Sequence, residues 1–184
     1  MDKGRKVLVV DHEAKRLLDT SRTLQSAGYE VLGAATGGEG LQVAQKARPD
    51  LILLEVALPD ISGVDLARQI KRDAELAPSY VALLAAGETP AAIQARGLES
   101  GADGYILRTA PSREFLARVE ALLRRQQAEQ ALRASLQEWQ DIFHALSDAV
   151  YLVDPQGRIV HCNLALAKLL GRPPSEVIGR RCCE

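Results

Sequence analysis

Three ionisable residues, Asp11, Glu55 and Arg108, each directly follow a short apolar run in this chain. The run before Glu55, Leu51 to Leu54, shows no polar alternation, which is typical of a strand buried on both faces. In open α/β sheets, functional sites lie just outside the carboxyl ends of the strands. We therefore expect these three side chains at the functional edge of a parallel sheet. The simpler alternative for Glu55 is that it only marks the solvated end of its strand.

The elements that would position these residues alternate regularly over the first 125 residues. The expected strands are 6–10, 29–35, 51–54, 80–85 and 105–107, with helices between them that include 64–74 and 90–100, and a long helix from Pro111. Such alternation is typical of βαβ units, in which helices cover both faces of a parallel sheet. The sequence therefore predicts an α/β fold with a doubly wound, five-stranded parallel sheet. We expect one pocket at its strand ends, near Asp11, Glu55, Ala85 and Arg108.

The long helix changes character after Leu123, where a polar interval rich in Gln and Arg begins. Apolar residues then recur at steps of four, three, four and three, at Leu132, Leu136, Trp139, Phe143 and Leu146. This a/d spacing is typical of a coiled-coil seam. An amphipathic helix packed on its own domain is the alternative, because about two heptads are present and three to four are usual. The polar interval, 124–131, is a candidate register break.

The C-terminal part contains a hairpin pattern between Ala149 and Asn163. Two strand-like runs flank Asp154-Pro-Gln-Gly157, which has the residue types of a turn. Asn163 can cap a following helix, which Gly171 would end. Because two strands and two small helices do not close a core, we expect the chain to be cut inside a second domain.

The composition excludes several classes of protein. The chain has 184 residues, of which 47% are hydrophobic and 26% charged, and a net charge of −1, which gives no general attraction to nucleic acid or anionic lipid. No apolar run approaches the roughly 18 residues needed to cross a bilayer. Three cysteines do not form the pattern of a secreted disulfide framework, so a reducing cytoplasm is the expected location.

Residues 5 to about 125 resemble a receiver domain of two-component signalling. The resemblance rests on Val7-Leu-Val-Val-Asp11, Pro49-Asp-Leu-Ile-Leu-Leu54, Leu58-Pro-Asp60, Ser62-Gly63 and Gly101-Ala-Asp-Gly-Tyr105. It implies a flavodoxin-like sheet with strand order 2-1-3-4-5.

Residues from about 136 to 184 resemble the first part of a PAS sensor domain, and the helix before them resembles the signalling helix that joins such modules. The matching residues are the string Leu146 to Val160, then Asn163 and Leu169-Leu-Gly171. We therefore expect a receiver domain at 1–125, a helical coiled-coil linker at 126–146 and a truncated, partial α+β PAS domain at 147–184.

The chain departs from the receiver family at the residues that carry its chemistry. The family implies two acids after strand one, an acceptor aspartate after strand three, a hydroxyl residue after strand four, and a switch aromatic and a lysine on strand five. These positions here hold Asp11 and His12, Glu55, Ala85, Tyr105 and Arg108. Only the first acid and the aromatic residue match.

These departures predict that phosphotransfer is absent or very poor. The Glu55 carboxylate lies one methylene further out than that of aspartate, and a misplacement of about 1 Å can lower a rate about 100-fold. In the family the two acids after strand one bind Mg²⁺, which wants near-ideal octahedral oxygen coordination, so His12 in place of the second acid weakens the site and leaves Asp11 and Glu55 as the candidate metal ligands. Ala85 cannot donate a hydrogen bond to a phosphoryl oxygen. The alternative is a working Mg²⁺-dependent receiver that still accepts a phosphoryl group.

In this fold Arg108 and Glu55 lie on neighbouring strand ends, so we expect them to pair, with Asp11 nearby. The resulting hypothesis is a pseudo-receiver, not itself an enzyme, that passes its state through a dimerising helix to a PAS sensor domain. A histidine kinase or another signalling protein is the expected partner, and any output kinase would lie beyond Glu184. A flavodoxin-like enzyme is a weaker alternative, because the turn after the first strand lacks glycine.

Overall fold

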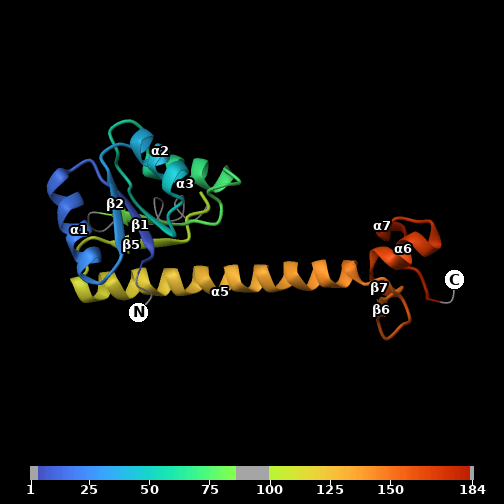
Figure 1. The fold of residues 1–184 in the computed structure, drawn as a ribbon. Coiled ribbons are helices and arrows are strands. Elements are labelled where there is room, and N and C mark those ends of the chain that lie inside the picture. The colour runs from blue at the N-terminus through green and yellow to red at the C-terminus, as the bar shows by residue number, and fades with distance from the viewer. Residues whose placement is uncertain (1–3, 86–99, 183–184) are drawn as a thin grey trace. The chain divides into compact units, whose positions relative to one another are not determined.

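A computed structural model describes residues 4–85 and 100–182 (Figure 1). It divides into two compact units, Met1–Glu129 and Gln130–Glu184. The helix predicted at 90–100 lies outside the described residues.

The first unit is built on a five-stranded parallel sheet in the order β2-β1-β3-β4-β5, which confirms the predicted fold class and strand order. Its strands are β1 (Lys6–Val10), β2 (Glu30–Ala34), β3 (Leu51–Glu55), β4 (Tyr80–Ala85) and β5 (Gly104–Leu107). The central strands β3 and β4 are buried along their whole length. This burial explains why their sequences are continuous apolar runs rather than alternating ones.

Helices cover both faces of this sheet (Figure 1). They are α1 (Ala14–Ser26), α2 (Gly37–Ala47), α3 (Gly63–Arg72) and α5 (Ser112–Ala145). Successive strand residues point to opposite faces, so Leu8 packs in the core under α2 and α3, and Val9 in the core under α1 and α5. Two apolar layers therefore hold the sheet rigid and leave only its edges for polar chemistry.

The helix α5 runs without interruption through the polar interval 124–131. Beyond it, four of the five predicted seam residues are exposed, with Leu132 at 61% and Leu136 at 54%. The fifth, Phe143, is buried and stacks on Trp139 with ring centroids 5.1 Å apart. The helix therefore presents an apolar stripe over residues 132–142.

The second unit contains the predicted hairpin, with β6 (Tyr151–Val153) antiparallel to β7 (Ile159–Cys162). Two short helices follow, α6 (Leu164–Leu170) and α7 (Pro174–Val177). Asn163 caps α6 as predicted, because its Oδ1 accepts from the Leu166 N–H at 3.0 Å. Gly171 ends that helix in the left-handed region. Within the described ranges, neither unit holds a helix long and apolar enough to cross a membrane.

Candidate functional site

Asp11, Glu55 and Arg108 meet at the carboxyl ends of the parallel strands, which we call the carboxyl edge of the sheet. Asp11 follows β1, where its N–H donates to the Ala34 carbonyl at 3.0 Å, and it is fully buried. Glu55 is the last residue of β3 and is 4% exposed. Arg108 follows β5, where its N–H donates to the Ala85 carbonyl at 2.8 Å. Strand pairing alone therefore brings two acids and one base together.

One guanidinium nitrogen of Arg108 contacts both acids. Its Nη2 lies 2.5 Å from Asp11 Oδ2 and 2.7 Å from Glu55 Oε2, which confirms the predicted pairing. None of these three atoms makes a well-directed hydrogen bond, so the contacts are ion pairs in character. Because both carboxylates are buried, removing Arg108 would leave two like charges facing each other without solvent.

A second guanidinium group, which the sequence reasoning missed, belongs to Arg16 on α1. Its Nε lies 2.7 Å from Glu13 Oε2 and 3.7 Å from Asp11 Oδ1, and its Nη1 lies 3.9 Å from Glu55 Oε2. The cluster therefore opposes two buried carboxylates with two cations. The sequence held one sign of this contact: Arg16 lies in the first turn of α1, the helix that begins soon after Asp11.

The loop after β3 holds Glu55 through a close approach at Gly63. A Cβ atom at Gly63 would lie 2.1 Å from the Glu55 carbonyl oxygen, which no side chain tolerates without a shift of the backbone. The Gly63 N–H also donates to the Val56 carbonyl at 2.9 Å. The start of α3 is therefore pressed against the last residue of β3, and glycine is required for this contact.

Asp60, in the same loop, binds the N-terminus of α2. Its carboxylate accepts from the N–H groups of Gly37 at 2.9 Å and Gly38 at 2.8 Å. These hydrogen bonds lower the pKa of Asp60 below 3.8, and the bond from Gly37 has a larger effect than the bond from Gly38. Thr36 is the N-cap of this helix, and its side chain accepts from the Glu39 N–H. The positive end of α2 is thus satisfied by a carboxylate of the chain itself.

The other predicted site residues lie around the cluster. His12 is exposed, one position beyond Asp11. Ala85 is buried at the end of β4, opposite Leu107, and offers only a methyl group. Tyr105 is partly buried and packs against the core on the α2–α3 face. Their correspondence to the second acid, the hydroxyl residue and the switch aromatic remains a prediction.

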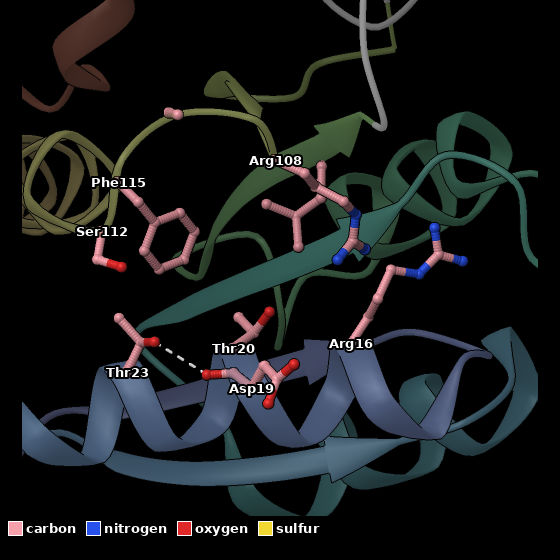
Figure 2. A pocket seen from close by; sticks show the side chains of 9 residues that line it. Arg16, Asp19, Thr20, Thr23, Arg108, Ser112 and Phe115 are labelled. Carbon is pink, nitrogen blue, oxygen red and sulfur yellow. Dashed lines mark hydrogen bonds between the residues drawn. The ribbon is translucent and has the colours of Figure 1, made fainter.

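A cavity of about 260 Å³ lies beside the cluster, between α1 and α5 (Figure 2). Figure 2 shows Arg16 and Arg108 at one end of it, and Phe115, Ser112 and Thr23 at the other. The lining mixes cationic, hydroxyl and aromatic groups. The cavity gives the Arg108 side chain a route toward solvent.

The arrangement of these residues does not fit Mg²⁺. That ion needs near-octahedral oxygen ligands at about 2.0–2.1 Å. Here Arg108 lies between Asp11 and Glu55, where a cation would have to bind. Among the described residues, no group of three or more His, Cys, Asp or Glu side chains is placed to hold a metal ion. Metal binding by Asp11 and Glu55 remains a prediction that requires Arg108 to leave first.

Comparison with known proteins identifies the family to which the domain with this site belongs. Residues 7–120 match the family described as the response regulator receiver domain. The chain belongs to this family. A second match, to the PAS fold, covers residues 137–182, so the receiver is followed by a PAS region as predicted. Both regions are signalling modules rather than catalytic ones.

The receiver has many relatives. The phosphate regulon transcriptional regulatory protein PhoB of Pseudomonas aeruginosa is 44% identical over 124 residues, which cover 66% of this chain and 53% of PhoB. The alkaline phosphatase synthesis transcriptional regulatory protein PhoP of Bacillus subtilis is 35% identical over 122 residues, covering 66% of this chain and 50% of PhoP. The chain therefore spans about half the length of these relatives.

Solved structures agree with the receiver fold. The CheY-like response regulator receiver domain protein of Methanospirillum hungatei is 28% identical, with a TM-score of 0.63, and the match covers 68% of this chain and 98% of that one. The BeF₃-activated DrrB receiver domain is 31% identical, with a TM-score of 0.57, covering 65% of this chain and 97% of that one.

Proposed function

We propose that this receiver of a two-component response regulator is a pseudo-receiver, in which a built-in ion pair replaces phosphorylation. The observation that carries this proposal is the position of Arg108 Nη2, which is 2.7 Å from the Glu55 carboxylate and 2.5 Å from that of Asp11. Glu55 stands where the family has its acceptor aspartate, so the oxygen that would attack a phosphoryl group is already held by a cation.

Three features reinforce this block on phosphotransfer. Arg108 lies between the two acids that would bind Mg²⁺, and without that ion the charge of a transferring phosphoryl group is not neutralised. Ala85 has no hydroxyl group for a phosphoryl oxygen. Gly63 presses α3 against the Glu55 backbone, which restricts any rearrangement that would bring the longer side chain into line.

The ion pair would hold the receiver in one state. A carboxylate carries a charge of −1, and a phosphoryl group up to about −2, so any imitation of the phosphorylated form by Glu55 is partial. Arg108 offers a cation to that carboxylate at the end of β5. We infer that the receiver acts through a constant conformation or through partner binding, and that its state reaches the PAS sensor region through α5.

The alternative function is a working Mg²⁺-dependent receiver. The cavity between α1 and α5 favours it, because Arg108 lines this space and could turn into it. The lack of a well-directed hydrogen bond at Arg108 Nη2 points the same way. Release of Arg108 would free both Asp11 and Glu55 for a metal ion.

Intact-mass spectrometry after incubation with a small-molecule phosphodonor and Mg²⁺ separates the two functions. We expect no added phosphoryl group on the parent chain. Glu55→Asp in the same assay shows whether the acceptor alone blocks the reaction, and Glu55→Asp with Arg108→Lys shows whether the arginine contributes. Phosphorylation of the parent chain, lost in Glu55→Gln, would overturn the proposal and establish the working receiver.

We further propose that α5 pairs with a second copy of the chain in a coiled coil. Leu132, Leu136 and Trp139 are exposed at a/d spacing, and Ser135 and Gln140, which flank Leu136 and Trp139, carry no charge. Leu136→Glu should convert the dimer to a monomer in light scattering, with Gln137→Glu, also exposed, as the matched control. A parent chain that is monomeric at micromolar concentration would refute this pairing.

The partners proposed for this receiver are a histidine kinase or another signalling protein. PhoB and PhoP are named transcriptional regulators, but the chain spans about half of each. A net charge of −1 gives the chain itself no general attraction to nucleic acid. We therefore propose protein partners rather than DNA for the regions described.

A further inference from the structure

At the amino-terminal ends of the strands, opposite the charged cluster, lies a buried polar residue, Gln126, that belongs to the predicted linker. Gln126 follows the last apolar residue that α5 contributes to the core, Leu123, and lies within the polar interval of the sequence. It is nevertheless 2% exposed. A buried amide requires hydrogen-bond partners, and these partners identify what the helix contacts.

All of the hydrogen-bonding groups of the Gln126 side chain have partners from outside α5. Its Nε2 donates to the Asp50 carbonyl at 2.9 Å and to the Pro78 carbonyl at 3.2 Å. Its Oε1 accepts from Arg5 Nη1 at 3.1 Å, and the same nitrogen donates to the Leu123 carbonyl at 3.1 Å. One side chain therefore joins the helix to three separate segments of the chain.

These three segments enter the sheet. Arg5 directly precedes β1, Asp50 directly precedes β3, and Pro78 lies two residues before β4. Asp50 is itself tied to the neighbouring strands, because its Oδ2 accepts from the Lys6 N–H at 2.8 Å and its carbonyl accepts from the Tyr80 N–H at 2.9 Å. Gln126 therefore contacts the segments that lead into three strands, β1, β3 and β4.

The neighbours of Gln126 reinforce the contact. The Arg125 guanidinium lies over the Tyr80 ring, 5.9 Å from its centroid. Burial is the main cause that raises the pKa of Tyr80 to about 12, and the nearby Glu129 carboxylate is the second. The Tyr80 phenol therefore stays neutral beside the Arg125 guanidinium. The turn of α5 from residue 125 to 129 is therefore attached to the sheet by polar contacts after its apolar contacts have ended.

We propose that Gln126 is a positioning residue that fixes the turn of α5 from residue 125 to 129, and its helical phase, against the amino-terminal ends of the receiver strands. This positioning does not require Glu55 to block phosphotransfer. Its use in passing a signal to the PAS region rests on the proposed function.

Hydrogen exchange of the full chain tests the proposal. Gln126→Met keeps the shape of the side chain and removes its donors and acceptor, and Gln127→Met, at an exposed position, is the matched control. We expect the amides of residues 127–133 to exchange at least about 10-fold faster in Gln126→Met, with the amides of β3 and β4 unchanged. Unchanged exchange at 127–133, or equal acceleration of helix and strands, would overturn the proposal.

Gln126→Glu adds a readout that simple packing would not move. One oxygen of the carboxylate would keep the contact with Arg5, and the other would face the carbonyl oxygens of Asp50 and Pro78, whereas a protonated acid could donate to one of them. We expect fast exchange at residues 127–133 at pH 7 and slower exchange, relative to the parent, as the glutamate is protonated. A ratio to the parent that does not change with pH would contradict the proposal.

If Gln126→Met does not fold, Arg5→Met removes one contact and should give the same local pattern with a smaller acceleration. No phosphodonor is needed, so the phosphotransfer result stays separate.

Discussion

The two edges of the receiver sheet solve the same problem, burying polar groups, in opposite ways. At the carboxyl edge, Asp11 and Glu55 share one guanidinium nitrogen of Arg108, with contacts that are short but poorly directed. At the amino-terminal ends of the strands, the uncharged amide of Gln126 makes hydrogen bonds to two carbonyl groups and from Arg5 that use all of its polar groups. The first arrangement depends on a balance of charge, and the second on geometry.

This difference suggests a division of roles. Charged groups in a low-dielectric site respond strongly to the loss or gain of one charge, so the carboxyl edge is suited to hold or change a state. A satisfied amide responds to displacement of its partners, so the amino edge is suited to hold a helix in place. The charged cluster and the buried contact of α5 thus lie at opposite ends of the same strands.

The largest effect is expected where charge balance is broken. Arg108→Met should lower the free energy of unfolding by about 3–5 kcal/mol, because it leaves two buried carboxylates with only the more distant Arg16 as a cation. Gln126→Met should cost about 1–3 kcal/mol, since it removes the buried hydrogen bonds of Gln126 to two carbonyl groups and from Arg5. Urea denaturation of both variants measures the two costs. Equal costs, or a larger one for Gln126→Met, would remove the contrast between the edges.

A smaller effect is expected at Gly63, where α3 approaches Glu55. Gly63→Ala should destabilise the receiver by about 1–3 kcal/mol through overpacking, because its Cβ would lie 2.1 Å from the Glu55 carbonyl oxygen. Gly38→Ala is the control, since its Cβ would meet only Asp60 Oδ2 at 3.5 Å. That helical position should gain about 0.4–1 kcal/mol instead. Thermal denaturation in which both variants behave alike would show that the loop yields without cost.

The smallest effect is expected from Asp60, which is exposed and bonded to the N-terminus of α2. Because the folded protein lowers the pKa of Asp60 below 3.8, its stabilisation is present above that pH and is lost as the pH falls through the lower folded value. The melting temperature of the parent should therefore exceed that of Asp60→Ala at pH 5–7, and the difference should shrink below pH 3.8. Asp65→Ala, an exposed acid in α3, is the control. A difference independent of pH would exclude this role.

The sequence predicted the sheet well, because burial on both faces leaves a visible record in continuous apolar runs. The strand Tyr80–Ala85 and the end of β3 at Glu55 match the structure. The pairing of Glu55 with Arg108 was predicted correctly, but their strands are not neighbours as expected: β4 lies between β3 and β5, and the long arginine side chain spans it. The prediction required the strand order implied by the receiver resemblance.

Arg16 and Gln126 escaped prediction for a shared physical reason. Both are long polar side chains on helices, and periodicity assigns such residues to the solvated face. Their roles depend on reach: Arg16 extends to the end of β1 and Gln126 to the loops before β3 and β4. The role of Asp60 was hidden similarly, because its partners Gly37 and Gly38 lie on a helix far away in the sequence.

The central claim is that Glu55 and Arg108 act as one unit, and a double-mutant cycle tests it most directly. Glu55→Gln, Arg108→Met and the double variant would be unfolded in urea beside the parent chain. We expect the double variant to lose less stability than the two single variants together, with a coupling energy of at least about 1.5 kcal/mol, as for other close charge pairs. Losses that add within about 0.5 kcal/mol would mean that the two residues are independent, and would contradict the account.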